Sequence, residues 1–172
     1  MEIKKERFIL RQFNKNDLKS LVKHINNKDI AYYTSNIPFP YKKNYGIEWL
    51  NKTINEYRKK EVRKLALAIE IKGEVVGCVE LKKIYKNHKS EIGYWLSKDF
   101  WGKGIMTEVI KAIVDYAFKN FDLVRIFAYV REGNPASSRV LEKCSFKKEG
   151  TLRKAAKDKN KFIDLYLYAI TK

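Results

Sequence analysis

Residues 95–107 read WLSKDFWGKGIMT, and this stretch decides how the rest of the chain is interpreted. It joins an apolar run at residues 91–96 to a helical pattern that begins near Ile105. Glycines in a strand-to-helix loop leave consecutive backbone N–H groups free to face an anion, and the helix N-terminus adds partial positive charge. The loop therefore indicates a phosphate-binding site, although Gly102 and Gly104 alone also fit a loop tightened only for packing.

Two common phosphate-binding patterns are excluded. The Walker pattern GxxxxGK[ST] is absent from the chain. The dinucleotide pattern GxGxxG fails because Thr107 stands at its third glycine position. A nucleoside triphosphate or NAD is therefore disfavoured as the ligand.

Hydrophobic periodicity on either side of the loop predicts strands and helices whose order gives a mixed α/β sheet. Lys72-Gly73-Glu74 predicts a tight hairpin turn with positive φ at the glycine, and Gly93 predicts a bulge or a close backbone approach within a strand. The expected strands are 8–13, 65–71, 75–81, 91–96, 124–130, 146–155 and 162–170, and the expected helices are 16–26, 44–60, 105–120 and 134–143. The side chains expected to face inward from helix 105–120 are Met106, Val109, Ile110, Ile113, Val114 and Ala117.

Length and composition suit one compact domain over residues 1–172, because 45% of the residues are hydrophobic and 13% aromatic. No window reaches the roughly 18 apolar residues of a membrane span, and residues 1–7 lack the apolar run of a signal peptide. We therefore expect a soluble cytoplasmic protein without a membrane partner. Cys78 and Cys144 lie far apart in apolar surroundings, which favours buried reduced thiols and predicts no metal site.

The charge is strongly positive, with 37 Lys and Arg against 20 Asp and Glu for a net charge of +17. This favours anionic partners such as nucleic acid, a ribosome surface or a polyphosphate cofactor. The positive residues are scattered rather than clustered, so a lysine-rich coding bias is the alternative reading.

The order of several motifs carries a family resemblance. Gly-Tyr-Trp-Leu at 93–96 precedes Trp-Gly-Lys-Gly at 101–104, and Asn134 begins an Asn-x-x-Ser helix. The sequence thereby resembles the GNAT acetyltransferase superfamily, and within it the ribosomal-protein N-terminal acetyltransferases, which residues 149–154 also resemble. The resemblance covers nearly the whole chain. It implies a single GNAT domain, with a mixed, mostly antiparallel sheet of about seven strands flanked by about four helices.

The resemblance implies acetyl-CoA as donor, with its pyrophosphate held mainly by main-chain N–H groups. The sequence departs from the superfamily pattern at Trp101, where Gln or Arg is usual, and at Met106, where Gly or Ala is usual. A bulky Met106 could crowd the phosphate loop, unless its side chain faces the core. The residues implied to hold the pyrophosphate are Trp101, Gly102, Lys103, Gly104, Met106 and Thr107.

The resemblance also implies that strand 91–96 splays from strand 124–130, so that pantetheine inserts between them. Backbone groups of Tyr94, Trp95 and Leu96 would then bind it. One N–H group would face the thioester oxygen, where a preorganised donor can be worth ~3 kcal/mol. Asn134 matches the cofactor-contacting asparagine of the family, and it is also a suitable N-cap before Pro135.

Departure of coenzyme A needs a donor for its thiolate. Leu141 stands where many family members have a tyrosine, and the ribosomal-protein subfamily instead implies Ser137, which otherwise is an ordinary residue of a first helical turn. An α-amine acceptor, with a pKa of about 7.7 to 8.0, is about a tenth neutral at pH 7 and needs little help from a base. Glu91 or Glu80 could relay the proton through water, or both are solvated strand residues. His24 and His88 are both expected at the surface.

The acceptor site is implied to lie between the first two helices, the aromatic segment 32–40 and the last hairpin. The main hypothesis is acetylation of a protein N-terminus, with a ribosomal protein as one candidate and ribosome association as a further partnership. A small-amine acetyltransferase for an antibiotic or polyamine, and a non-catalytic basic RNA- or ribosome-binding module, are the alternatives. Tyr166 and Tyr168 form an exposed dimer surface or face a helix, so a monomer and a homodimer both stay open.

Overall fold

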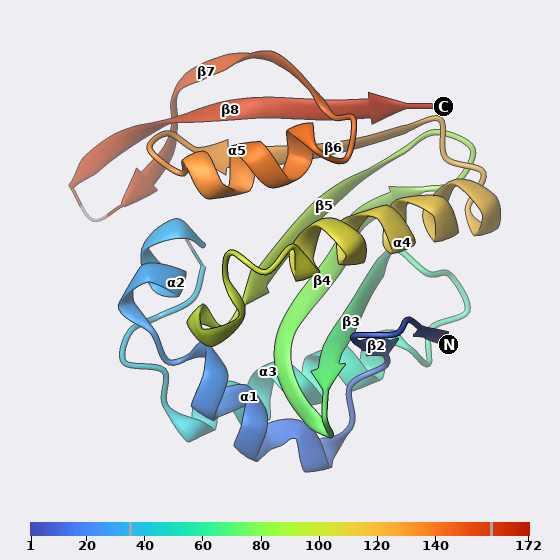
Figure 1. Ribbon diagram of the computed structural model, residues 1–172, viewed down its shortest axis with the longest axis vertical. Helices are drawn as coiled ribbons and strands as arrows, with labels where there is room; N and C mark the ends of the chain where they lie inside the picture. Colours follow the sequence, from blue (N-terminus) through green and yellow to red (C-terminus); the bar gives the residue numbers. More distant parts are fainter. Residues whose placement is uncertain (35, 159) are drawn as a thin grey trace.

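The computed structural model describes residues 1–34, 36–158 and 160–172, and in this part of the chain eight strands form one sheet (Figure 1). The strand order is β1-β2-β3-β4-β5-β6-β8-β7, and all neighbours are antiparallel except the parallel pair β5 and β6. The strands are β1 (Glu2–Lys4), β2 (Ile9–Arg11), β3 (Lys64–Ile71), β4 (Glu74–Tyr85), β5 (Lys89–Leu96), β6 (Arg125–Arg131), β7 (Lys147–Asp158) and β8 (Lys161–Thr171). The helices are α1 (Leu18–Ile25), α2 (Lys28–Tyr33), α3 (Lys43–Glu56), α4 (Ile105–Asn120) and α5 (Pro135–Glu142), with short 3-10 turns η1 (Lys15–Asp17) and η2 (Lys98–Phe100).

The mixed, mostly antiparallel sheet confirms the predicted fold class and corrects the number of elements. Over the described residues, β1 adds an eighth strand and α2 adds a fifth helix. Both are too short to show a hydrophobic period, and β1 is a polar edge strand of three residues. The boundaries also move: η1 replaces the first turn of the predicted helix 16–26, and α3 ends before the predicted residue 60.

The hairpin between β3 and β4 confirms the turn predicted from the sequence. Lys72 and Gly73 have φ values of 51° and 79°, as a turn with two left-handed residues requires. The bulge predicted at Gly93 is wrong, because Gly93 pairs in regular register with Glu80 on β4. A Cβ atom at Gly93 would meet the side-chain nitrogen of Lys82 at 3.2 Å rather than any backbone atom.

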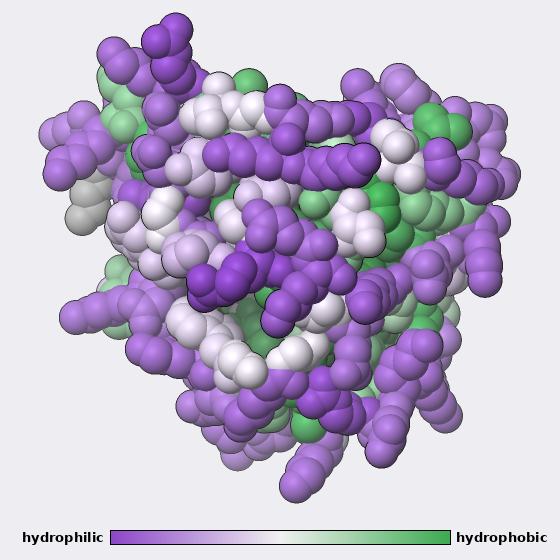
Figure 2. All heavy atoms as spheres, turned by 45° about the horizontal axis from the view of Figure 1, so that its top comes forward, coloured by the Kyte–Doolittle hydropathy of each residue, from purple (hydrophilic) through white to green (hydrophobic). Residues whose placement is uncertain are grey.

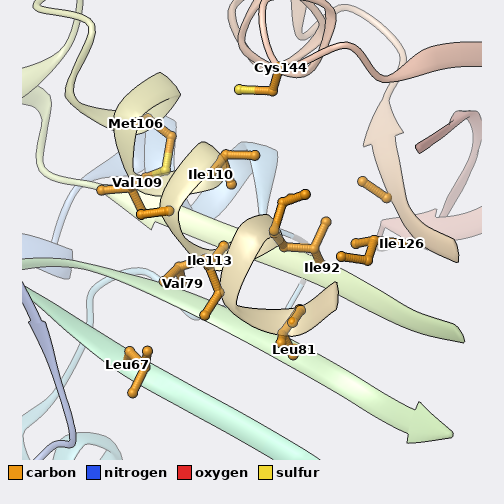
Figure 3. Close-up of a cluster of buried hydrophobic side chains, with 14 of the residues drawn as sticks. Leu67, Val79, Leu81, Ile92, Met106, Val109, Ile110, Ile113, Ile126 and Cys144 are labelled. Atoms are coloured by element: carbon orange, nitrogen blue, oxygen red, sulfur yellow. The ribbon is translucent and has the colours of Figure 1, made fainter. Parts of the chain in front are cut away.

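Helices cover both faces of the sheet. Helices α4 and α5 pack on one face, and α1, α2 and α3 pack on the other (Figure 1). The inward face of α4 meets buried side chains of four strands, including Leu67, Val79, Ile92 and Ile126 (Figure 3). All six side chains that helical spacing assigned to this face are buried, namely Met106, Val109, Ile110, Ile113, Val114 and Ala117.

The parallel pair β5 and β6 opens into a V. The two strands pair only from Lys89 with Arg125 to Glu91 with Phe127. Beyond this point β6 stays paired with β8, while β5 continues along β4 to Leu96. Figure 1 shows the two strands diverging toward the loop that precedes α4. The splay that the family resemblance implied is therefore present.

Among the helices in the described part of the chain, none combines the length and the apolar character needed to cross a membrane.

Candidate active site

The loop before α4 has the backbone geometry of an anion site. Gly102 and Gly104 have φ values of 73° and 75°, in the left-handed region that favours glycine. Gly104 is the N-cap of α4, and the helical ladder begins where Glu108 N–H donates to the Gly104 carbonyl oxygen at 3.2 Å. The N–H groups of the first helical turn, at residues 105–107, therefore have no intrahelical acceptor and face outward.

Arg7 adds a cation to this loop that sequence reasoning missed. Its Nη1 donates to the Lys103 carbonyl oxygen at 2.9 Å, and its guanidinium forms an ion pair with Glu108. Its Nη2 would lie 3.6 Å from a Cβ atom on Gly104. A single arginine in a polar N-terminal segment carries no local signal, so only the tertiary structure reveals this contact.

The side chains of the loop residues have partners of their own. Trp101 Nε1 donates to the Leu96 carbonyl oxygen at 2.7 Å, and Lys103 Nζ donates to the Asp99 carbonyl oxygen at 2.7 Å. Met106 is 7% exposed and packs in the core below Cys144 (Figure 3). Its bulk is therefore accommodated in the core, and the crowding considered from the sequence does not occur.

The V between β5 and β6 is lined by backbone groups of alternate β5 residues. Ser97 N–H donates to the Val76 carbonyl oxygen on β4 at 2.7 Å. In an antiparallel ladder residues two apart bond to the same strand, so the backbone of Trp95 also faces β4 and that of Tyr94 and Leu96 faces the V. This register favours Tyr94 and Leu96 over Trp95 as the pantetheine contacts that the resemblance implied.

Two hydroxyl groups meet at the side of this V. Tyr94 Oη lies 2.7 Å from Ser137 Oγ, which joins β5 to the first turn of α5. Asn134 is the N-cap of α5, and its Oδ1 accepts the Ser137 N–H at 3.1 Å. Burial raises the pKa of the Tyr94 phenol. The structure thus brings together Ser137, Asn134 and Tyr94, of which the Tyr94 side chain was not anticipated.

Figure 2, in which the top of Figure 1 comes forward, shows a hollow with a hydrophobic floor near the middle of this face. Residues of intermediate hydropathy, drawn white, and hydrophilic residues, drawn purple, surround it (Figure 2).

The two candidate base residues lie together on the other face of the sheet. Glu80 and Glu91 are half-buried there, and Lys82 Nζ lies between them, 3.5 Å from Glu80 Oε2 and 3.7 Å from Glu91 Oε1. Lys64 Nζ also lies 2.6 Å from Glu80 Oε1. These two atoms form an ion pair, but their angles do not suit a hydrogen bond. Lys83 Nζ lies 3.9 Å from Glu91 Oε2. Both carboxylates are therefore neutralised by lysines.

His24 is buried, which corrects its expected surface position, whereas His88 is exposed. His24 Nδ1 lies 3.0 Å from Ser97 Oγ and its Nε2 lies 2.8 Å from Glu74 Oε2. The aromatic ring of Phe100 in η2 packs edge-on against the His24 ring, with 6.3 Å between the two ring centres. Helical spacing placed His24 on α1 but could not show that Ser97, far away in sequence, closes over it.

The proposed acceptor side is closed by a contact between α2 and the end of β6. Arg131 Nη1 donates to the Tyr32 carbonyl oxygen at 3.1 Å and to Asp158 Oδ2 at 2.9 Å. Its guanidinium lies 4.0 Å from the centre of the Tyr32 ring. Tyr32 and Phe39 of the aromatic segment 32–40 are exposed, and Ser35 lies outside the described residues.

The C-terminal tyrosines are less exposed than one sequence reading required. Tyr168 is buried, and its hydroxyl donates to Glu142 Oε1 on α5 at 3.0 Å. Tyr166 is half-buried. Of the two sequence readings, Tyr168 therefore fits the one that faces a helix.

Comparison with known proteins identifies similar sequences over most of the chain. Residues 7–147 match the model of an acetyltransferase (GNAT) domain. An uncharacterized N-acetyltransferase of Bacillus licheniformis is 30% identical over 170 residues, covering 97% of this chain and 94% of that protein. A ribosomal-protein-serine acetyltransferase of Escherichia coli is 31% identical over 97 residues, covering 56% of this chain and 54% of that protein. A spermidine N(1)-acetyltransferase of Vibrio cholerae is 26% identical over 144 residues, covering 83% and 80% of the two chains.

Solved structures share the fold. A GNAT-family acetyltransferase from Bacillus anthracis has a TM-score of 0.86 at 26% identity, covering 99% of this chain and 98% of that chain. A ribosomal-protein α-N-acetyltransferase in complex with coenzyme A has a TM-score of 0.90 at 21% identity, with coverage of 99% and 98%. At that lower identity, the likeness shows the fold alone.

Proposed function

We propose that this chain, which belongs to the GNAT acetyltransferase family, acetylates the N-terminal α-amine of a protein, with a ribosomal protein as the first candidate acceptor. As a family member it is an N-acetyltransferase that uses acetyl-CoA. The acceptor and the roles of individual residues are the proposed part.

The residues present fit acetyl-CoA. The outward N–H groups of residues 105–107 suit its diphosphate, and the Arg7 guanidinium, which is paired with Glu108, lies beside them. The backbone groups of Tyr94 and the N–H of Leu96 in the V suit the amides of its pantetheine arm, while the Leu96 carbonyl oxygen already accepts from Trp101 Nε1. Acetyl-CoA supplies an acetyl group activated by its bond to sulfur. The protein has to bind and orient the two substrates and to move the protons.

The observation that carries the acceptor proposal is the neutralised pair of carboxylates. Glu80 and Glu91 face Lys82 on the sheet face opposite α4, and each has a second lysine nearby. A polyamine is a polycation and binds best where acidic side chains are unpaired. An α-amine is about a tenth neutral at pH 7 and needs neither an acidic pocket nor a strong base.

The transfer needs two proton movements. A bond forms between the acceptor nitrogen and the acetyl carbon, the carbon–sulfur bond breaks, and its electron pair leaves on sulfur. The nitrogen loses one proton, for which Glu91 acting through water is the candidate relay. The sulfur gains one, for which the Ser137 hydroxyl at the first turn of α5 is the candidate donor.

The test uses the purified protein with acetyl-CoA and three acceptors of matched concentration. These are peptides with a free N-terminus, the same peptides with a blocked N-terminus and an internal lysine, and spermidine. We expect coenzyme A release and a mass gain at the α-amine only with the first set. Preferred acetylation of spermidine would overturn the acceptor proposal and would agree with the spermidine N(1)-acetyltransferase relative.

A matched variant sharpens this test. Lys82→Gln removes the ammonium that lies between the two carboxylates and leaves the sheet face otherwise intact. We expect this variant to gain activity toward spermidine relative to the α-amine peptides, because the carboxylates lose a cationic partner. Lys52→Gln, which removes an exposed ion pair on α3, is the control and should leave the preference unchanged.

A further inference from the structure

The side chain of Tyr94 has no part in the two proton transfers described above. The side chain leaves β5 on the face that α4 and α5 cover, where it packs against the core. Its hydroxyl lies 2.7 Å from Ser137 Oγ. Ser137 is thereby held at three atoms, because its backbone N–H donates to Asn134 Oδ1, its hydroxyl meets the phenol, and its carbonyl oxygen lies 3.4 Å from Tyr94 Oη as a longer and weaker acceptor.

The chemistry of the two hydroxyls sets the useful direction of this hydrogen bond. Ser137 has one hydroxyl hydrogen, which cannot serve both Tyr94 and a departing sulfur. If Tyr94 donates, that hydrogen stays available. Burial raises the pKa of the Tyr94 phenol, so the phenol keeps the hydrogen that it can donate to Ser137 Oγ. A hydroxyl that accepts a hydrogen bond also becomes a stronger donor.

We propose that Tyr94 is a positioning residue that aims the Ser137 hydroxyl at the sulfur of coenzyme A and strengthens it as a donor. This inference rests on the proposed function, because it concerns the same site. It also accounts for Leu141, which stands where many GNAT enzymes carry a tyrosine and is here fully buried in the core. In this chain the phenol comes from β5 instead of α5.

The alternative is that the Tyr94 hydroxyl is purely structural and only links the sheet to α5. Tyr168 provides the comparison, because its hydroxyl also joins the sheet to α5, through Glu142 at 3.0 Å. A structural link contributes to stability at Tyr94 and at Tyr168 alike. Of the two hydroxyls, only one that acts through Ser137 is expected to change the pKa of the coenzyme A thiol.

The experiment measures the pKa of the coenzyme A thiol when bound to the protein, from the ultraviolet absorbance of the thiolate during a pH titration. A hydrogen bond to the thiolate lowers this pKa relative to free coenzyme A. We expect Tyr94→Phe and Ser137→Ala each to raise the bound thiol pKa by about one unit relative to wild type. The double variant should show no larger shift than Ser137→Ala alone.

The control variant is Tyr168→Phe, which should lower the melting temperature without moving the thiol pKa. With any accepted amine, Tyr94→Phe should lower kcat about tenfold while the Kd for acetyl-CoA stays unchanged. An unchanged thiol pKa in Tyr94→Phe would overturn the inference, as would equal shifts in Tyr94→Phe and Tyr168→Phe. Ser137→Ala decides the matter if Tyr94→Phe does not fold, because an unshifted thiol pKa there removes the group through which Tyr94 acts.

The titration uses coenzyme A alone, without an acceptor. Failure of the α-amine proposal therefore leaves this result intact, and a wild-type thiol pKa equal to that of free coenzyme A overturns the inference even if α-amine peptides are acetylated.

Discussion

Gly104 is the residue on which the proposed diphosphate site depends most directly. Its φ of 75° costs a residue with a Cβ atom about 1 to 2 kcal/mol, and that atom would approach Arg7 Nη2 at 3.6 Å. We expect Gly104→Val to raise the Kd for acetyl-CoA at least tenfold, because the first-turn N–H groups lose their alignment. Calorimetric titration of acetyl-CoA measures this directly.

The control for this substitution is Gly73→Val in the β3–β4 turn. Gly73 has a φ of 79° and open space around its Cβ position, so it carries the same backbone strain far from the loop. Both variants should melt at a lower temperature than wild type. Equal Kd values for acetyl-CoA in wild type and Gly104→Val would show that this loop is not the diphosphate site.

The side chain and the backbone of Met106 are expected to have different roles, the first in the core and the second in binding acetyl-CoA. Its side chain is buried in the core, whereas its N–H belongs to the first turn of α4. Met106→Ala should destabilise the fold by about 2 to 5 kcal/mol through the cavity it leaves. The Kd for acetyl-CoA, measured well below the melting temperature, should change less than threefold. A large loss of affinity with little loss of stability would reverse this assignment.

Sequence periodicity could predict where Met106 points, because α4 alone determines which of its faces is apolar. It could not predict the contact between Tyr94 and Ser137 or that between Arg7 and Lys103. These pairs lie 43 and 96 positions apart, and each depends on how separate elements meet. The candidate acid was therefore identifiable from a motif, while the group that holds it was not.

At the scale of elements, His24 connects three parts of the fold. It joins α1 to the β3–β4 hairpin through Glu74 and to the start of η2 through Ser97. His24→Ala leaves the buried Ser97 hydroxyl without its partner, so we expect a loss of about 1 to 3 kcal/mol in the free energy of unfolding. Urea denaturation checks this, with the exposed His88→Ala as control. Equal stability of the two variants would contradict the role.

The same contact predicts a pH dependence. Hydrogen bonds from Lys23 and His24 lower the pKa of Glu74 from 4.5 to about 2. A carboxylate with a depressed folded-state pKa stabilises the fold above its unfolded pKa, and this contribution is lost as the pH falls toward the folded value. The melting temperature should therefore fall between pH 4.5 and pH 2. Glu74→Gln should show a shallower fall over that interval, and parallel curves would contradict the assignment.

Elements with a long apolar stripe were predictable, and short polar ones were not. Helix α4 begins and ends at the predicted residues 105 and 120, because eight of its residues are buried along one face. Strand β1 and helix α2 owe their structure to neighbours, through pairing with β2 and through Asn27, whose side chain accepts from the first-turn N–H groups of α2. The sequence of α2 has no period to read, although α2 borders the proposed acceptor side.

For the whole molecule, the sequence predicts the acetyl donor, acetyl-CoA, better than it predicts the amine that accepts the acetyl group. The proposed acetyl-CoA site consists mainly of backbone groups from one continuous stretch, residues 94–107, so a motif can predict it. The proposed acceptor side lies between separate elements, among them α2, and the charge of the nearby β4 and β5 carboxylates depends on which lysine each one meets. The net charge of +17 does not resolve this, because it sums over the whole surface.

Thermal melting with and without acetyl-CoA tests the premise that all these proposals share. A ligand that binds only the folded state stabilises it by ~2.7 kcal/mol at 100 times its Kd. For a chain of this length that corresponds to a rise in melting temperature of about 5 to 10 °C. The rise should be much smaller in Gly104→Val, and an oligoribonucleotide should give no comparable rise in the wild type at physiological salt. The reverse pattern, stabilisation by RNA and none by acetyl-CoA, would favour the basic RNA-binding module, because non-specific phosphate binding then explains the charge better than catalysis does.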